Sequence, residues 1–465
     1  MKVALVFPGI SETGFSKKRH LQEYSWINHG LSSLGACAKK AGHTVRLIDL
    51  RELSGWDEVR DEIDKFKPRV VGITAMSVDF DYALRVAEIV RASTNPGIKT
   101  VVGGPHPSIM PGEAAADPSI DHVVVGEGEI SFIKLLEDIE NGRLPEKIIA
   151  GEHPNLDSLP FVDRELFRFR ESPIDTFLEP PFVTLIAGRG CRYNCSFCQP
   201  AERKIFGNRV RRRSVANIID ELKALKEKYD FRSFMFHDDC LTEDMGWIIE
   251  FCDAYMKNGF RRPFVCQSRA DIICKNEDMV RLMKRAGCAM FLIGFESGND
   301  RILKFLRKGT TVEMNYRAAK ICKKYGVRIW ANYMFGVPTE TREEVSDTVR
   351  MIQAIKPYRP SPAFFTPHPG SDLYEYCIKN DLSLVESYSG FSRSPNEAKI
   401  KGIDYVFLRK ALEGSKKRFL SVRLARKIDF IRERRLKHAF FECAAFFKKR
   451  QQPNLFSPRK QRKRV

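Results

Sequence analysis

The sequence predicts an α/β protein with two parallel sheets in series: a doubly wound sheet, then a partial barrel, then a basic helical C-terminal segment. Short β-branched runs alternate with amphipathic helical patterns over residues 1–150 and again over residues 182–375, as in βαβ units. Residues 151–181 are predicted to be a linker and 376–465 the C-terminal segment. Prolines interrupt every periodic pattern of the linker, at Pro154, Pro160, Pro173, Pro180 and Pro181.

Length and composition indicate a folded globular protein. The chain has 465 residues, 43% of them hydrophobic and 29% charged, which is enough for two or three domains with a core. Outside one cluster the cysteines stand singly in apolar or helical patterns, as buried thiols do in a reducing compartment. The first apolar run stops at Pro8-Gly9, and no later run reaches the roughly 18 residues that span a membrane. We therefore expect a cytoplasmic protein.

The first 150 residues are expected to form the doubly wound sheet. Strands are predicted at 3–7, 44–50, 70–76, 100–103 and 122–125, and helices at 30–41, 82–93 and up to Lys67. In such sheets ligands bind beyond the carboxyl ends of the strands. The loops at those ends hold Ser77, Gly103, Gly104, Pro105, Gly126, Glu127 and Gly128. Two of these loops are glycine-rich, which lets the backbone approach a large ligand closely. No Gly-x-Gly-x-x-Gly follows the first strand, so a dinucleotide is disfavoured.

Residues 182–375 are expected to form the partial barrel. Six strands are predicted, at 182–187, 233–237, 264–267, 289–294, 328–335 and 361–366, with helices at 214–229, 244–258, 276–286, 312–325 and 342–356. Six parallel strands leave a barrel open at one side, and its active residues should lie on the loops at the strand carboxyl ends. Those loops hold Asp239, Arg269, Glu296 and the turn from Gly336 to Pro338.

Three cysteines, Cys191, Cys195 and Cys198, directly follow the first barrel strand. Thiolates at these spacings can hold three irons of a four-iron cluster and leave the fourth iron open to a small molecule. A zinc knuckle is the alternative, but structural zinc takes four protein ligands. Since no second Cys-x2-Cys follows and only Cys240 or His237 would complete such a site, we favour the iron–sulfur cluster.

This cysteine loop, with Phe197 just before the third cysteine, resembles that of the radical S-adenosylmethionine (SAM) enzymes. Later loops are similar to theirs as well: Phe236-His237-Asp238-Asp239, Gly294-Phe295-Glu296-Ser297-Gly298, Gly336–Thr341 and Pro367–Tyr374. The resemblance implies a [4Fe–4S] cluster on the three cysteines. It places SAM beside Phe197, Asp239, Arg269, Glu296, Gly336 and Pro338. Glu296 could accept from the ribose hydroxyls, Arg269 could pair with the SAM carboxylate, and the Gly336–Pro338 turn could present backbone to adenine.

A second resemblance covers the N-terminal part. Val101–Pro107 and Asp121–Glu129 look like the Rossmann-like cobalamin (B12)-binding domain that precedes many radical SAM modules. It implies cobalamin at the glycine-rich loops, in a base-off form, because the Asp-x-His-x-x-Gly motif that supplies a lower axial histidine is absent. We expect His106 to be a loop histidine bonded to a neighbouring carbonyl. A domain that binds nothing is the alternative.

Together the resemblances imply a cobalamin-dependent radical SAM C-methyltransferase. In that chemistry the cluster passes an electron to SAM, a 5′-deoxyadenosyl radical takes hydrogen from an unactivated carbon, and methylcobalamin donates the methyl group. Two alternatives stay open: radical cyclisation, oxidation or rearrangement, as in the cyclase of anaerobic bacteriochlorophyll synthesis, and an iron–sulfur or corrinoid carrier. The expected partners are a small-molecule or lipid-like substrate and an external flavodoxin- or ferredoxin-like electron donor.

The net charge of +19 is concentrated at the C-terminus, because residues 401–465 hold 21 Lys and Arg against 5 Asp and Glu. From Tyr405 the pattern is helical and includes aromatic residues, with Phe440, Phe441, Phe446 and Phe447 near its end. Such helices suit an anionic membrane surface or pack an apolar face on the barrel. The resemblance of Leu408-Arg409-Lys410-Ala411 to a segment of cobalamin-dependent relatives favours packing for the first half. We favour peripheral membrane contact over nucleic acid as a partner, and predict disorder over 451–465.

Overall fold

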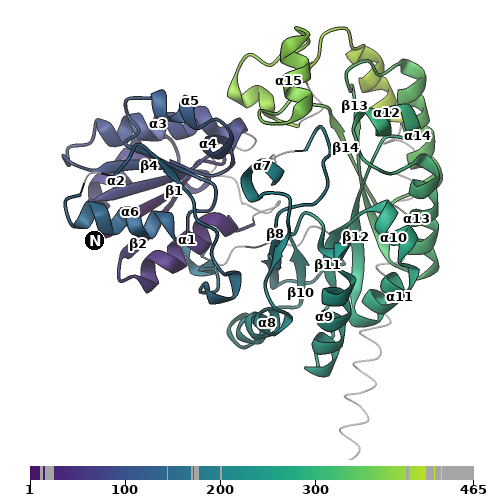
Figure 1. Cartoon of the computed structure of the whole chain (residues 1–465), viewed down its shortest axis with the longest axis horizontal. Coiled ribbons are helices and arrows are strands. Elements are labelled where there is room, and N and C mark those ends of the chain that lie inside the picture. The colour runs from purple at the N-terminus through teal and green to yellow at the C-terminus, as the bar shows by residue number, and fades with distance from the viewer. Residues whose placement is uncertain are drawn as a thin grey trace, which may run out of the picture. The chain divides into compact units, whose positions relative to one another are not determined.

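The computed structural model describes residues 1–10, 14–15, 26–143, 145–168, 171, 177–198, 202–393, 397–414, 424 and 431. The chain divides into one unit from Met1 to Leu412 and a second from Glu413 to Val465. Both sheets belong to the first unit (Figure 1). The four phenylalanines from Phe440 to Phe447 and the segment predicted to be disordered lie outside the described residues.

The first sheet has six parallel strands in the order β2-β1-β3-β4-β5-β6. They are β1 (Lys2–Phe7), β2 (Thr44–Asp49), β3 (Val70–Thr74), β4 (Lys99–Gly103), β5 (His122–Val125) and β6 (Ile148–Ala150). β1 pairs with both β2 and β3, so the strand order reverses there and opens a crevice at the carboxyl edge. The predicted doubly wound fold is therefore confirmed, with β6 as a strand that the sequence did not predict.

Helices cover both faces of this sheet. Alternate residues of β1 point to opposite faces: Val3 and Leu5 pack with α1 (His29–Lys40) and α6 (Ser131–Glu140). Ala4 and Val6 pack on the other face with α2 (Trp56–Phe66) and α3 (Phe80–Arg91). Both faces are buried, which explains why the strands read as continuous apolar runs. Two short helices, α4 (Pro105–Ile109) and α5 (Pro111–Ala116), join β4 to β5.

Described residues of the predicted linker are packed into the structure. Two 3₁₀ turns, η3 (Leu156–Ser158) and η4 (Arg164–Phe167), bury Leu156, Arg164 and Phe167. The Arg164 side chain donates to Glu221 Oε1 at 2.9 Å and to the Thr184 carbonyl at 2.6 Å. Because these partners belong to the second sheet and to the helix over 215–229 that follows its first strand, the segment is anchored to the barrel.

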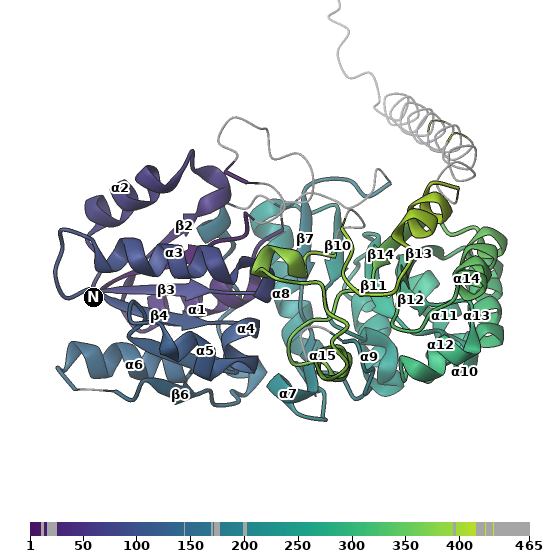
Figure 2. The ribbon, with the colours of Figure 1, turned by 90° about the horizontal axis from the view of Figure 1, so that it is seen from above.

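The second sheet also has six parallel strands, in the order β14-β13-β12-β11-β10-β7, which is the order of the chain. They are β7 (Phe182–Leu185), β10 (Ser233–Phe236), β11 (Phe264–Ser268), β12 (Cys288–Glu296), β13 (Arg328–Phe335) and β14 (Arg359–Phe364). The longer helices are α8 (Val215–Tyr229), α9 (Met245–Lys257), α11 (Glu277–Ala286), α13 (Val312–Lys324) and α14 (Arg342–Ile355). Helices α11, α13 and α14 lie outside the curled sheet (Figure 2), so the predicted partial barrel is confirmed.

Several short elements lie in the loops that follow the barrel strands. They are the antiparallel hairpin of β8 (Gly188–Arg189) and β9 (Arg211–Arg212), and the helices α7 (Glu202–Phe206), α10 (Ala270–Lys275), α12 (Asp300–Phe305) and α15 (Asp372–Lys379). The sequence predicted none of these, because each is shorter than the window over which periodicity can be recognised.

The first part of the C-terminal segment packs on the barrel. In the helix over 405–414, Leu408 and Leu412 are buried, and the Tyr405 ring lies 5.3 Å from that of Phe364, centroid to centroid. The Tyr405 hydroxyl accepts the backbone N–H groups of Lys399 and Ile400, each at 2.9 Å. Packing is thus confirmed for these residues. Within the described ranges no helix is long and apolar enough to cross a membrane.

Candidate functional site

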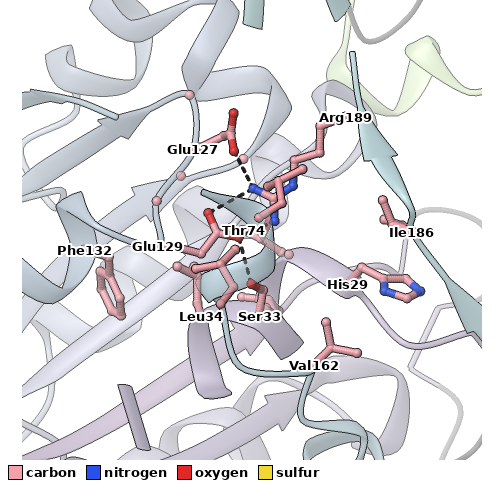
Figure 3. A pocket seen from close by; sticks show the side chains of 18 of the residues that line it. His29, Ser33, Leu34, Thr74, Glu127, Glu129, Phe132, Val162, Ile186 and Arg189 are labelled. Atoms are coloured by element: carbon pink, nitrogen blue, oxygen red, sulfur yellow. Dashed lines mark hydrogen bonds and ion pairs between the residues drawn. The ribbon is translucent and has the colours of Figure 1, made fainter. Parts of the chain in front are cut away.

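A cavity of about 360 Å³ lies between the carboxyl edge of the first sheet and the loops that follow β7 and β10. Thr74, Gly103, Gly104 and the Gly126–Glu129 loop line it from the first sheet, and Ile186, Gly188–Gly190, His237 and Asp239 from the barrel. Apolar side chains of Leu34, Phe132, Val162 and Ile186 form much of its wall, and a group of charged side chains crosses it (Figure 3). Both ligand-binding edges that the sequence predicted therefore face one space.

The first sheet lines the cavity largely with backbone. Gly104 has φ +100°, and a Cβ there would lie 2.7 Å from Thr74 Oγ1 and 3.0 Å from Ala75 N, so only glycine fits. Gly126 has φ +83°, and nothing lies within 4 Å of where its Cβ would be. Gly103, Gly104, Gly126, Glu127 and Gly128 all line the cavity as expected for a large ligand.

The predicted residues Ser77 and Pro105 do not line this cavity. Ser77 Oγ lies 3.1 Å from His106 Nδ1, and Pro105 begins α4. The His106 ring packs on Phe80 with centroids 4.1 Å apart, and its Nε2 is 3.6 Å from Glu113 Oε2. His106 is thus a buried histidine that joins α3, α4 and α5. The expectation of a carbonyl partner for its ring was wrong: Nδ1 pairs with the Ser77 hydroxyl, and Nε2 forms no hydrogen bond at its 3.6 Å separation from Glu113.

The cysteine loop is anchored by backbone contacts to two helices of the barrel. Ser196 N–H donates to the Leu306 carbonyl at 3.0 Å, and the Leu373 N–H donates to the Ser196 carbonyl at 2.8 Å. Cys191, Cys195 and Cys198 are partly exposed and form no disulfide. The described residues contain no group of three or more His, Cys, Asp and Glu gathered as around a single metal ion. A cluster makes a different demand, because each thiolate binds its own iron.

Arg269 lies directly against this loop. Its Nη1 is 3.9 Å from Cys195 Sγ, and its guanidinium stacks 3.5 Å from the ring centroid of Tyr193. Nε donates to Asp271 Oδ1 at 3.0 Å and Nη2 to the Lys308 carbonyl at 2.5 Å. A cation held in this way suits thiolate ligands and an anionic cluster, so the donor set fits the implied group. The stacking partner Tyr193 was not predicted.

Glu296 forms a buried ion pair that the sequence did not predict. Lys308 Nζ donates to Glu296 Oε1 at 2.9 Å and lies 5.9 Å from the ring centroid of Phe197. Burial opposes the Lys308 charge, but Glu296 and Cys195 together hold the pKa of Lys308 above its usual value. Glu296 has φ +61°, and a Cβ at Gly294 would lie 2.2 Å from its Oε1. In the sequence, the only local hint of this ion pair is that Lys308-Gly309 closely follows the short helix over 300–305.

In the turn after β13 the backbone N–H groups of Gly336 and Val337 are already paired. Glu340 Oε2 accepts the backbone N–H groups of Gly336 at 2.6 Å and Val337 at 3.3 Å, and Pro338 has no N–H. Burial raises the pKa of Glu340 to about 7. Because those two N–H groups are occupied, the expected backbone contact to adenine would have to come from carbonyl oxygens of the turn, which would accept from the amino group of adenine.

The two aspartates that follow β10, Asp238 and Asp239, lie in different surroundings. Asp239 lines the cavity, whereas buried Asp238 accepts the Ala187 N–H at 2.9 Å. Burial raises the pKa of Asp238 to about 6. Although aspartate is a favoured N-cap residue, neither of the two caps the next long helix: the α9 cap is Asp244, whose side chain accepts the Trp247 N–H at 3.0 Å.

The two sheets face one cavity, and the three-cysteine loop begins directly after Gly190 of its wall, although none of the three cysteines lines the cavity itself. Residues 22–136 match the B12 binding domain family and residues 185–352 the radical SAM superfamily. The chain belongs to the radical SAM enzymes that carry an N-terminal B12-binding domain. Its cofactors are a [4Fe–4S] cluster, SAM and cobalamin, as the sequence predicted.

Three known proteins illustrate the similarity. The "Uncharacterized methyltransferase PH0819" of Pyrococcus horikoshii is 31% identical over 80% of this chain and 83% of its own length. The anaerobic magnesium-protoporphyrin IX monomethyl ester cyclase of Rubrivivax gelatinosus is 28% identical over 76% of this chain and 66% of its own. The structure of the radical SAM methyltransferase TsrM from Kitasatospora setae, with cobalamin and a [4Fe–4S] cluster, covers 84% of both chains with a TM-score of 0.64 and 19% identity, which shows a shared fold.

Proposed function

We propose that this protein is a methyltransferase that uses cobalamin and SAM to methylate an unactivated carbon of a small-molecule or lipid-like substrate. The observation that carries the proposal is the shared cavity: glycine-rich loops of the first sheet line one side, and Gly188–Gly190, which lead into the cysteine loop, line the other. Groups bound by the two domains could therefore meet one substrate there. The name of the Pyrococcus relative supports methyl transfer.

The residues of the site would bind and orient the reactants. Cys191, Cys195 and Cys198 would hold the cluster, Arg269 and Glu296 would bind the polar groups of SAM, and Gly104 and Gly126 would let cobalamin approach the first sheet. When bound, these groups supply a carbon-centred radical and a methyl group. Apolar side chains such as Ile186 and Val162 exclude water, which would otherwise compete for reactive species.

The balance of this reaction fixes its products. One SAM gives up its methyl group and leaves S-adenosylhomocysteine. A second SAM accepts an electron and is cleaved to methionine and 5′-deoxyadenosine, the latter carrying the hydrogen that the substrate lost. An external reductant must supply the electrons, which agrees with the expected flavodoxin- or ferredoxin-like partner.

Anaerobic incubation with methyl-labelled SAM, hydroxocobalamin, reduced flavodoxin and host extract tests the proposal. Labelled product together with 5′-deoxyadenosine supports methyl transfer. 5′-Deoxyadenosine without labelled product favours cyclisation, oxidation or rearrangement, for which the similarity to the cyclase speaks. If neither labelled product nor 5′-deoxyadenosine forms, the carrier alternative is favoured. Cys195→Ala, prepared in parallel, gives the background of SAM breakdown that is independent of the cluster.

A further inference from the structure

The hairpin of β8 and β9 carries two arginines that face each other. Arg189 and Arg211 are cross-strand partners in the register of the hairpin. Like charges in that arrangement repel each other unless an anion lies between them. Glu127 of the first sheet supplies the anion: its Oε2 accepts from Arg189 Nη1 at 2.5 Å, and its Oε1 contacts Arg211 Nη2 and accepts from His153 Nδ1 at 2.7 Å.

A second carboxylate strengthens the contact. Glu129 Oε1 accepts from Arg189 Nη2 at 2.5 Å and from Ser33 Oγ at 2.8 Å, and Glu129 Oε2 lies 3.2 Å from Arg189 Nη1 (Figure 3). The side chains of Glu127 and Glu129 are only 2% and 5% exposed. Burial opposes the charge of Glu129, but Arg189 overcomes this and lowers its pKa. Without the arginines, Glu129 would lose its cationic partner and Glu127 would keep only His153, which is unfavourable for two buried carboxylates.

These ion pairs connect the two halves of the site. Glu127 and Glu129 alternate along the chain with Gly126 and Gly128, which line the cavity. Arg189 lies two residues before Cys191. Between them Gly190 has φ +95°, and a Cβ there would lie 2.9 Å from the Arg209 carbonyl, so the hairpin fixes the direction in which the chain enters the cysteine loop.

We propose that Arg189, Arg211, Glu127 and Glu129 form an ionic latch that positions the cobalamin loop against the cluster loop, and that cobalamin affinity depends on it while cluster assembly does not. The proposal rests on the assignment of the cavity to cobalamin. It makes these side chains positioning residues, since the Glu127 carboxylate is already shared by Arg189, Arg211 and His153.

Titration of cluster-loaded protein with hydroxocobalamin, followed by visible absorption, tests the latch. Arg189→Gln should weaken binding by about tenfold or more while the iron content stays at the wild-type value. The cobalamin affinity of Arg189→Lys should lie between those of the wild type and Arg189→Gln, because lysine keeps the charge but cannot form the bidentate contact. Arg143→Gln is the matched control, since Arg143 pairs with Asp138 away from the cavity and should leave the affinity unchanged.

A double-mutant cycle separates the latch from a general loss of structure. If Arg189 and Glu129 act through each other, Arg189→Gln/Glu129→Gln should bind cobalamin no more weakly than Arg189→Gln alone. Strictly additive effects, wild-type affinity in both single variants, or loss of iron together with cobalamin would each overturn the proposal. Absence of binding by the wild type would instead refute the assignment of the cavity to cobalamin, and the latch with it.

Discussion

The carboxyl edges of the two sheets are built on different principles. The strand order of the first sheet reverses, and its crevice is lined largely by glycines, which present only backbone. The barrel keeps its strands in chain order, and its edge presents buried, paired charges such as Arg269 with Asp271 and Lys308 with Glu296. One edge offers backbone and space, and the other offers fixed charge.

The difference matches the ligands. Cobalamin is large and carries many neutral amide groups, so it needs room and backbone partners. SAM is small and charged, and at the proposed site it would lie beside an anionic cluster, where ions that are already in place before it binds would stabilise it. The comparison predicts that the glycine edge is sensitive to steric change in addition to its ion pairs with Arg189, whereas the barrel edge is sensitive to loss of charge or ligand.

The largest effect should come from the cysteines. Cys195→Ala should abolish SAM cleavage and lower iron from about four per chain to background, because no other thiol can replace the ligand in that loop. Iron analysis and 5′-deoxyadenosine assay after anaerobic reconstitution measure this. Cys252→Ala, a buried thiol of α9, should change neither value. Retained cleavage in Cys195→Ala would end the cluster assignment.

A steric change should disable the glycine edge alone. Gly104→Val forces a β-branched residue to φ +100° and against Ala75, at a strain of about 1–3 kcal/mol that should weaken cobalamin binding by about 10- to 100-fold. The iron content of Gly104→Val should equal that of the wild type. In the wild type, cobalamin should bind in the base-off form. Gly112→Val in α5 is the control, since nothing lies within 4 Å of its Cβ position, and equal affinities of the two variants would contradict the steric account.

Loss of charge should act on the barrel edge. Lys308→Met leaves the buried Glu296 without its partner and should lower the free energy of unfolding by about 3–5 kcal/mol. Denaturation by guanidinium, followed by tryptophan fluorescence, measures it. The exposed Arg350 pairs with Asp347, and Arg350→Met should cost less than about 1 kcal/mol. If both substitutions cost the same, the buried pair contributes no more than a surface pair.

The smallest effect concerns pH. Glu340 has a pKa of about 7 in the folded protein, above the ordinary value of about 4.3, so the folded state keeps its proton where the unfolded state has lost it. The contribution of Glu340 to the free energy of unfolding therefore falls as pH rises from about 4 to 7. Glu340→Gln does not titrate, and its stability relative to the wild type should grow by about 2–4 kcal/mol over that range. A difference independent of pH would mean that Glu340 is already ionised.

Periodicity and position in the chain predicted much of the fold and part of the site. The strand from 328 to 335 and the strand from 122 to 125 have the predicted bounds, because continuous β-branched and aromatic runs identify buried parallel strands. Arg269, Glu296 and the Gly336 turn lie at strand ends as expected, since the order of β and α segments places every such loop at one edge.

What the sequence did not predict depends on contacts between distant residues. The run Arg211-Arg212-Arg213 looks like a solvated basic stretch, yet Arg211 meets Glu127 of the other sheet and Arg213 meets Glu221 of α8. The pairing of Lys308 with Glu296 requires the β12–α13 connection to fold back, which no local pattern records. The 3₁₀ turns of the linker are recognisable only from the surfaces that bury them.

The shared cavity also sets a chronology for the maturation of the protein. Synthesis produces the strands of the first sheet first, and domains generally fold as they emerge. At that stage Glu127 and Glu129 have no arginine beside them, and the wall that carries Ile186 and His237 does not yet exist. If cobalamin binds in this cavity, as we propose, its pocket is complete only after the barrel has folded, and incorporation of the corrinoid would follow synthesis of both sheets.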